Sequence, residues 1–170
     1  MTTLTNKLPL GIAKALLKIT KSSNHTVAQT INVENEDGNA RYIATDGCSL
    51  LVVEKQLENP QLDTERFCAD QLNTYVTSKG FSPLTPTTDN DFQSFPDWQQ
   101  VMPKSEGRQV TVVGLDLKYL KAMHDISKAL KLDTKWKCTF HGDLYPTVWE
   151  PMNPQEYSRV SFIIMPVRIP

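Results

Sequence analysis

The chain has 170 residues, of which 39% are hydrophobic and 22% are charged. This composition is typical of a soluble globular protein that can bury a core. No apolar run approaches the roughly 18 residues that a membrane span needs, and we expect no secretory signal at the N-terminus. Cys48, Cys68 and Cys138 are odd in number and far apart, which indicates reduced thiols and a cytoplasmic protein.

The net charge is −1, but the charges are unevenly spread along the chain. Residues 1–33 carry four lysines and no acidic residue, whereas residues 34–70 carry nine acidic and three basic residues. Residues 108–137 are basic again, with seven lysines or arginines against three aspartates. Such a protein can present one basic and one acidic face, although ordinary solvated helix faces give the same pattern.

The first part of the chain has the pattern of one helix followed by three strands. Residues 10–20 place apolar side chains on one helical face and lysines on another. Strands are predicted over residues 26–33, 40–45 and 49–54, with the last two joined by a tight turn at Asp46-Gly47. With a short strand before the helix, these elements form a first module over about residues 4–56.

Residues 57–108 are the least regular segment and hold five of the eleven prolines. Phe67–Ser78 predicts a short strand that leads into a short helix, and residues 82–90 predict a loop. Phe95–Pro103 is aromatic and is fixed by prolines near both ends. We therefore expect it to be an ordered connector that packs on the sheets.

The last part of the chain, about residues 109–170, repeats the order of the first. It predicts a strand over 109–113, a helix over Asp116–Leu130, and three strands over 135–140, 144–149 and 158–167. The repeat is visible in the order of elements rather than in residue identity. We predict an α+β fold in a single domain of two β-α-β-β-β modules, with antiparallel sheets and two helices on one face.

The C-terminal segment Ile163–Ile169 is an apolar strand interrupted by Pro166 and followed closely by Arg168. Proline has no N–H to donate to a sheet, so this must be an edge strand or a strand that leaves the sheet. In either case its apolar side chains are available to line a shallow groove.

The sequence gives little support for an enzyme. It has no nucleophile elbow and no glycine-rich nucleotide loop, and Cys138 with His141 lacks the second pair of ligands that a zinc site needs. We expect no catalytic residue, no metal and no cofactor. A small enzyme built around Cys48, His124 and His141 stays as an alternative, and a bound metal or a thiol of lowered pKa would reveal it.

Three segments resemble one protein family. Arg41–Leu50 contains A-T-D-G-C-S-L, which resembles the A-T-D-G-H-R-L segment of the bacterial DNA polymerase III beta sliding clamp. Phe95–Pro103 looks like that family's F-P-D-Y-x-x-V-[LM]-P connector, and Met165–Ile169 looks like its C-terminal M-P-[MV]-R-L. The three occur in the family's order, which implies a clamp-like accessory protein of DNA replication.

In that family the three segments form a hydrophobic pocket where polymerases, the clamp loader and repair proteins dock short linear peptides. Cys48, Ser49 and Gln100 replace the family's histidine and two arginines, which reduces charge at the rim. Carried over by position, the resemblance implies a pocket lined by Thr45, Gly47, Leu50, Pro96, Val101, Ile163, Ile164, Met165, Pro166, Val167 and Arg168.

The resemblance also implies contact with duplex DNA, because the family's clamps encircle it as rings with basic inner helices. This chain is shorter than a family clamp, so a ring of the same size would need more copies. Two versions stay open: an oligomer that encircles DNA, and a monomeric mimic, decoy or adaptor, of host or phage origin. A structural protein that has lost the pocket is a further alternative. The residues implied to face DNA are Lys14, Lys18, Lys21, Lys118, Lys121 and Lys128.

Overall fold

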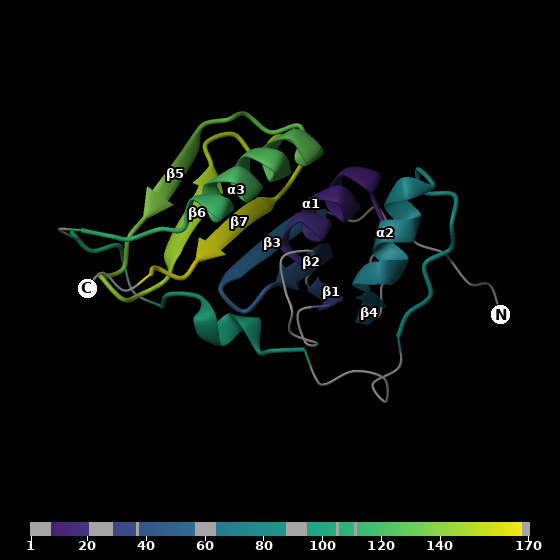
Figure 1. Ribbon diagram of the computed structural model, residues 1–170, viewed down its shortest axis with the longest axis horizontal. Helices are drawn as coiled ribbons and strands as arrows, with labels where there is room; N and C mark the ends of the chain where they lie inside the picture. Colours follow the sequence, from purple (N-terminus) through teal and green to yellow (C-terminus); the bar gives the residue numbers. More distant parts are fainter. Residues whose placement is uncertain are drawn as a thin grey trace.

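The computed structural model describes residues 8–20, 29–36, 38–56, 64–87, 95–104, 106–110 and 112–167. Seven antiparallel strands form one sheet in the order β4-β1-β2-β3-β7-β6-β5, and three α-helices cover one face of it (Figure 1). The predicted α+β fold is confirmed. In these ranges no helix is both long and apolar enough to cross a bilayer.

The first part of the chain forms α1 (Leu10–Thr20), β1 (Thr30–Glu36), β2 (Asn39–Thr45) and β3 (Ser49–Gln56). These elements match the predicted helix and three strands to within a few residues. The apolar face of α1 is fully buried against the sheet, as its periodicity predicts. The strand expected before α1 falls outside the described residues.

The segment between the modules contains one short strand and one short helix. β4 (Glu65–Cys68) and α2 (Ala69–Thr77) confirm the short strand and helix expected there, and β4 pairs with β1 at one edge of the sheet. The Tyr75 hydroxyl donates to the Leu8 carbonyl at 2.7 Å. Because α2 packs beside α1, three helices cover the sheet and not the two predicted.

The last part forms α3 (Leu117–Leu130), β5 (Trp136–Thr139), β6 (Thr147–Pro151) and β7 (Arg159–Ile164). Asp116 caps α3 by accepting the Lys118 N–H at 2.9 Å. The prediction of a strand over 109–113 is wrong for the described residues of that range. Gly114 makes only an isolated bridge to Val167. A segment with β-like residues forms a strand only where it can hydrogen-bond along its length to a neighbouring strand.

The C-terminal strand is central and leaves the sheet, which is the second of the two predicted alternatives. β7 pairs with β3 on one side and β6 on the other, so the two modules share a single sheet. The ladder ends at Ile164, before Pro166. The Val167 N–H donates instead to the Gly114 carbonyl at 2.9 Å.

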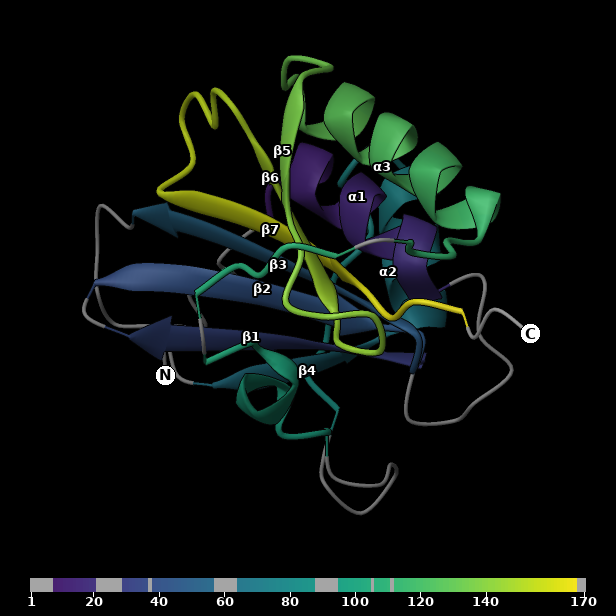
Figure 2. The same ribbon diagram turned by 90° about the vertical axis from the view of Figure 1, so that its left-hand side faces the viewer.

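The sheet has an apolar core on each face, because side chains alternate along its strands. Leu51, Phe162 and Ile164 face the helices, whereas Leu50 and Ile163 belong to a smaller cluster on the opposite face. Residues 95–102 cross that opposite face, which we call the outer face (Figure 2). This arrangement confirms that the connector is ordered and packs on the sheet.

Candidate functional site

The β2–β3 turn is built around the buried carboxylate of Asp46. Its Oδ1 accepts the N–H groups of Cys48 at 2.9 Å and Ser49 at 2.6 Å, and the Ser49 hydroxyl at 3.0 Å. Gly47 has a φ of +87°, which glycine adopts without strain. The predicted turn is confirmed, and it places Thr45 opposite Leu50 at the ends of their strands.

The C-terminal segment meets this turn. Leu50 pairs with Ile163, and the Met165 N–H donates to the Cys48 carbonyl at 2.9 Å as the chain leaves β7. The Thr147 hydroxyl donates to the Ile164 carbonyl at 3.2 Å and so holds the last residue of β7 in place. Two of the three family-like segments therefore lie side by side at one end of the sheet.

The connector supplies the third segment. Asp97 accepts the Gln99 N–H at 3.2 Å and begins a short 3₁₀ helix, η2 (Trp98–Val101). Phe95 and Trp98 pack in the outer-face cluster with Leu50 and Ile163. The neighbouring Pro96 and Val101 are exposed on the same connector.

Exposure divides the predicted pocket residues into a covered floor and an open rim. The side chains of Leu50 and Ile163 are only 3% and 2% exposed, because they are packed in the outer-face cluster that also holds Phe95 and Trp98. Ile164 is buried on the helix side of the sheet, so it does not share a face with these two. Arg168 lies outside the described residues. Besides Pro96, the apolar side chains of the predicted pocket that are open to a ligand include Val101, Met165 and Val167, which are 44%, 39% and 47% exposed.

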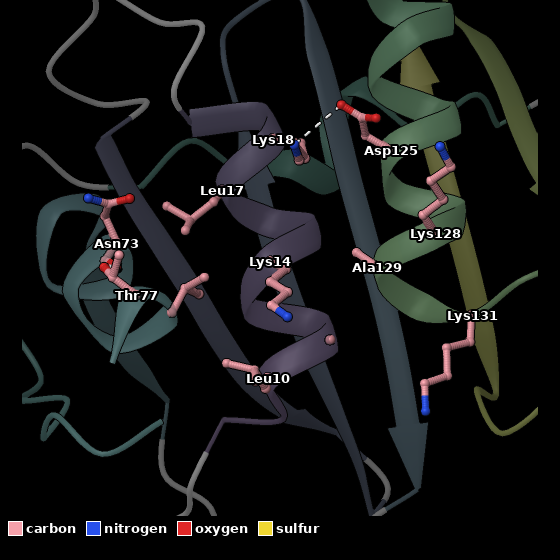
Figure 3. A pocket seen from close by; sticks show the side chains of 12 residues that line it. Leu10, Lys14, Leu17, Lys18, Asn73, Thr77, Asp125, Lys128, Ala129 and Lys131 are labelled. Atoms are coloured by element: carbon pink, nitrogen blue, oxygen red, sulfur yellow. Dashed lines mark hydrogen bonds and ion pairs between the residues drawn. The ribbon is translucent and has the colours of Figure 1, made fainter. Parts of the chain in front are cut away.

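The opposite side of the molecule carries a basic hollow. α1, α2 and α3 surround a cavity of about 750 Å³ (Figure 3). Lys14 and Lys18 line it from α1, and Lys128 and Lys131 line it from the end of α3. Among the described residues, Asp125 is the single acidic residue that lines it, and its Oδ2 lies 3.3 Å from the Lys18 Nζ.

Three of the predicted DNA-facing lysines, Lys14, Lys18 and Lys128, share this hollow. Lys118 and Lys121 lie elsewhere on α3, and Lys118 is engaged with Asp116 at 3.4 Å. Lys21 lies outside the described residues. Lys131 was missed by the sequence reasoning, although a basic residue at the C-terminal end of a helix is a common signal.

The three residues proposed for the alternative enzyme, Cys48, His124 and His141, belong to different elements. Cys48 is in the β2–β3 turn, His124 is on α3, and His141 follows β5. Among the described residues no group of three or more histidines, cysteines and acidic residues could hold a metal. Cys138, the thiol of the zinc-like pair with His141, is not activated either, because burial raises its pKa to about 11, which is opposite to the change that activates a nucleophile.

No model of a known protein family matches the sequence, and no curated protein matches it either. Solved structures do match. The DNA polymerase sliding clamp of Bacillus subtilis has a TM-score of 0.63 over 96% of this chain, at 13% identity. The Caulobacter crescentus pol III beta has a TM-score of 0.66 over 99%, at 13% identity. This chain has the fold of a bacterial sliding clamp. The Helicobacter pylori beta clamp bound to a DNA ligase peptide is also similar, with a TM-score of 0.64 over 94% of this chain and 12% identity.

The predicted resemblance to bacterial sliding clamps is thus confirmed at the level of the fold. The matches cover 64% of the Bacillus subtilis clamp, 68% of the Caulobacter crescentus clamp and 63% of the Helicobacter pylori clamp. The chain therefore spans about two thirds of the length of the sliding clamps that it matches.

Proposed function

We propose that this protein is a non-enzymatic accessory protein of DNA replication or repair that docks short linear peptides of its partners. What supports the proposal is the convergence of the Asp46 turn, the connector and the C-terminal segment. Its three cysteines carry free thiols, which supports a reducing, cytoplasmic location. We call the proposed site the docking surface, and it consists of Thr45, Gly47, Leu50, Pro96, Val101, Ile163, Met165, Pro166 and Val167.

Apolar contact would supply most of the binding energy at the docking surface. Met165 is flexible and polarisable, so it can adapt to different peptide side chains. Apart from the two chain neighbours of Gly47, no atom of the described residues lies within 4 Å of the position that a Cβ would take there, so a peptide backbone can approach it closely. A site of this kind supports micromolar affinity, on the order of 8 kcal/mol.

The proposal is tested by Met165→Asp. A carboxylate in an apolar contact loses solvation on binding, so we expect the Kd to rise about tenfold or more, roughly 1.4 kcal/mol. The probe is a fluorescent DNA ligase peptide of the kind bound to the Helicobacter pylori clamp, followed by anisotropy. Met165 is exposed, so the variant should keep the wild-type melting temperature.

Met152→Asp is the matched control, because Met152 is 71% exposed and lies just past β6, away from the docking surface. It should bind the peptide like the wild type. Equal binding by both variants would contradict the proposed site and favour a protein that kept the fold and lost the pocket.

Non-specific contact with DNA phosphates is a second candidate function, and the basic hollow between the helices supports it. Four lysines and one aspartate line this hollow, and phosphate contacts need cationic side chains rather than a sequence-reading motif. The contact would serve a clamp that holds DNA against its helical face.

A paired charge reversal, Lys14→Glu with Lys128→Glu, tests this second candidate. The affinity for a short labelled duplex should fall, and the slope of log K against log salt should shrink by about 2. Lys104→Glu with Lys137→Glu is the control, because it changes net charge equally at exposed lysines that do not line the hollow. If both pairs weaken binding equally, only net charge matters and the hollow has no special role.

A further inference from the structure

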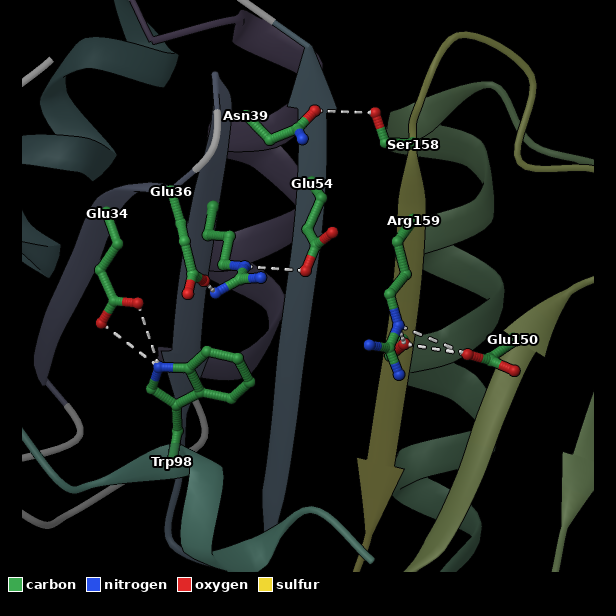
Figure 4. Close-up of polar contacts among 10 residues, drawn as sticks. Glu34, Glu36, Asn39, Glu54, Trp98, Glu150, Ser158 and Arg159 are labelled. Atoms are coloured by element: carbon green, nitrogen blue, oxygen red, sulfur yellow. Dashed lines mark hydrogen bonds and ion pairs between the residues drawn. The ribbon is translucent and has the colours of Figure 1, made fainter. Parts of the chain in front are cut away.

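The connector is attached to the sheet by a polar contact of Trp98 as well as by apolar packing. The indole Nε1 lies 3.2 Å from Oε1 and 3.3 Å from Oε2 of Glu34 (Figure 4), so its N–H is shared between both carboxylate oxygens. Glu34 belongs to β1, 64 residues earlier in the chain. Its Oε1 also accepts the Asn32 side-chain amide at 2.6 Å, which fixes the direction of the carboxylate.

A second charged group holds the ring of Trp98. The Arg41 guanidinium carbon lies 5.8 Å from the ring centroid, within cation–π range. Arg41 is itself fixed by ion pairs with Glu36 and Glu54, the latter at 2.9 Å. The register places Arg41 between Glu34 on β1 and Glu54 on β3. Glu34 and Arg41 contact the indole directly, and Glu54 holds Arg41 in place.

The contacts of Trp98 with Glu34 and Arg41 restrict where the connector can lie along the outer face. Apolar packing of Phe95 and Trp98 is non-directional and leaves a ring free to slide or tilt. A hydrogen bond to a charged acceptor is directional and stronger than a neutral one. Trp98 is 9% exposed, so the bond is largely shielded from competing water.

We infer that Glu34 and Trp98 are a positioning pair for the docking surface, an inference that rests on the proposed function. Neither needs to touch the peptide. By holding the first residue of η2 they hold Pro96 and Val101 at a constant distance from Met165 and Val167. When the bond is lost, only a fraction of molecules keeps the competent arrangement, and the apparent affinity falls by that fraction.

Glu34→Gln and Trp98→Phe test the inference. The first removes the charge and keeps an acceptor, and the second keeps an aromatic ring and removes the donor. We expect each to weaken binding of the ligase peptide roughly three- to tenfold. The double variant should be no weaker than Trp98→Phe alone, because Trp98→Phe already removes the contact that Glu34→Gln weakens.

The matched controls are Glu150→Gln and Trp136→Phe. Glu150 lies on β6 and pairs with Arg159, and the Trp136 indole donates to Ser127 of α3 on the helix side of the sheet, so both contacts are made away from the connector. Both controls should bind the peptide like the wild type. Additive losses in the double variant, or equal losses in the controls, would reduce the effect to general destabilisation and overturn the inference.

Hydrogen exchange in the absence of peptide separates this inference from the proposed function. The Gln100 N–H donates to the Asp97 carbonyl and the Met102 N–H to the Gln99 carbonyl, and both amides should exchange faster in Glu34→Gln. If the wild type fails to bind the peptide, the proposed function fails, and these amides still report whether the pair positions the connector. Unchanged exchange overturns the inference. Tighter peptide binding by the variants overturns it too, because Trp98 would then be a lid that competes with the peptide for Leu50 and Ile163.

Discussion

At the scale of single residues, the Asp46 carboxylate shapes the turn at one end of the proposed docking surface. It accepts three hydrogen bonds from two neighbouring residues, and these bonds turn β2 into β3 within a few residues. The turn directs the Cys48 carbonyl toward Met165. One side chain thereby links a local turn to the C-terminal segment, which lies more than a hundred residues away in the sequence.

A second residue-scale feature is the thiol of Cys138, and it predicts a pH effect on stability. Burial raises its pKa from about 9 to about 11. The folded protein therefore keeps a proton that the unfolded chain releases, so this stabilisation is complete below pH 9 and is lost as the pH rises to 11. We expect the difference in free energy of unfolding between the wild type and Cys138→Ala to shrink across that window.

Urea unfolding of both proteins at pH 8, 9, 10 and 11 measures this difference. The buried tyrosines, whose pKa values are also raised, titrate in both proteins and cancel. A difference that stays constant from pH 8 to pH 11 would contradict the assignment to Cys138.

At the scale of elements, the contact between α1 and α3 decides the shape of the basic hollow. The two helices approach closely at Gly11, where a Cβ would lie 2.7 Å from the Ala129 carbonyl oxygen. That oxygen belongs to the backbone of α3, so no side-chain rotation can relieve the contact. Glycine is needed here for space, and its backbone conformation is ordinary.

Gly11→Ala should therefore destabilise the protein, although alanine favours a helix by about 1 kcal/mol. Forcing the helices apart costs about 1–3 kcal/mol, so the expected net change in the free energy of unfolding is a loss. Lys14→Ala, an exposed change on the same helix, should stay within about 0.5 kcal/mol of the wild type. A Gly11→Ala variant that is as stable as the wild type would show that α3 can move.

At the scale of the whole molecule, the two edges of the sheet bear on the choice between ring and monomer. A ring closed by strand pairing between copies would need a free strand edge at both ends of every copy. The outer edge of β4 is occupied by the chain itself, because the Thr87 N–H and hydroxyl both donate to the Arg66 carbonyl, at 2.8 and 3.2 Å. At the other edge, the Arg108 N–H donates to the Phe140 carbonyl at 2.6 Å, just past β5. These contacts favour the monomeric version.

Thr87→Pro removes both the N–H and the hydroxyl that cover β4. We expect the wild type to sediment as a monomer up to high micromolar concentration and the variant to self-associate through the uncovered edge. Thr87→Val keeps the N–H and should behave like the wild type. A wild type that sediments as a large closed oligomer would rule out the monomeric decoy and favour a clamp that encircles DNA.

Much of the fold was predictable because the responsible interactions are local. Three features depend only on residues close together in the sequence: the apolar face of α1, the Asp46-Gly47 turn and the Asp116 cap. The connector was predicted to pack on a sheet because its aromatic and proline residues favour order. The positions of Pro96 and Val101 were predicted only through the family resemblance, since no local rule relates them to Met165.

Local sequence patterns specify most of the helices and strands and the apolar side of each, because both follow from periodicity and capping over short distances. Which elements became neighbours depended on the folding of the chain as a whole. In the folded protein β3 pairs with β7, and the described residues of 109–113 pair with no strand. Ile164 is buried on the helix side of the sheet, and Trp98 donates a hydrogen bond to Glu34. These outcomes depend on contacts between segments far apart in the chain, which form only when the whole chain closes around two cores.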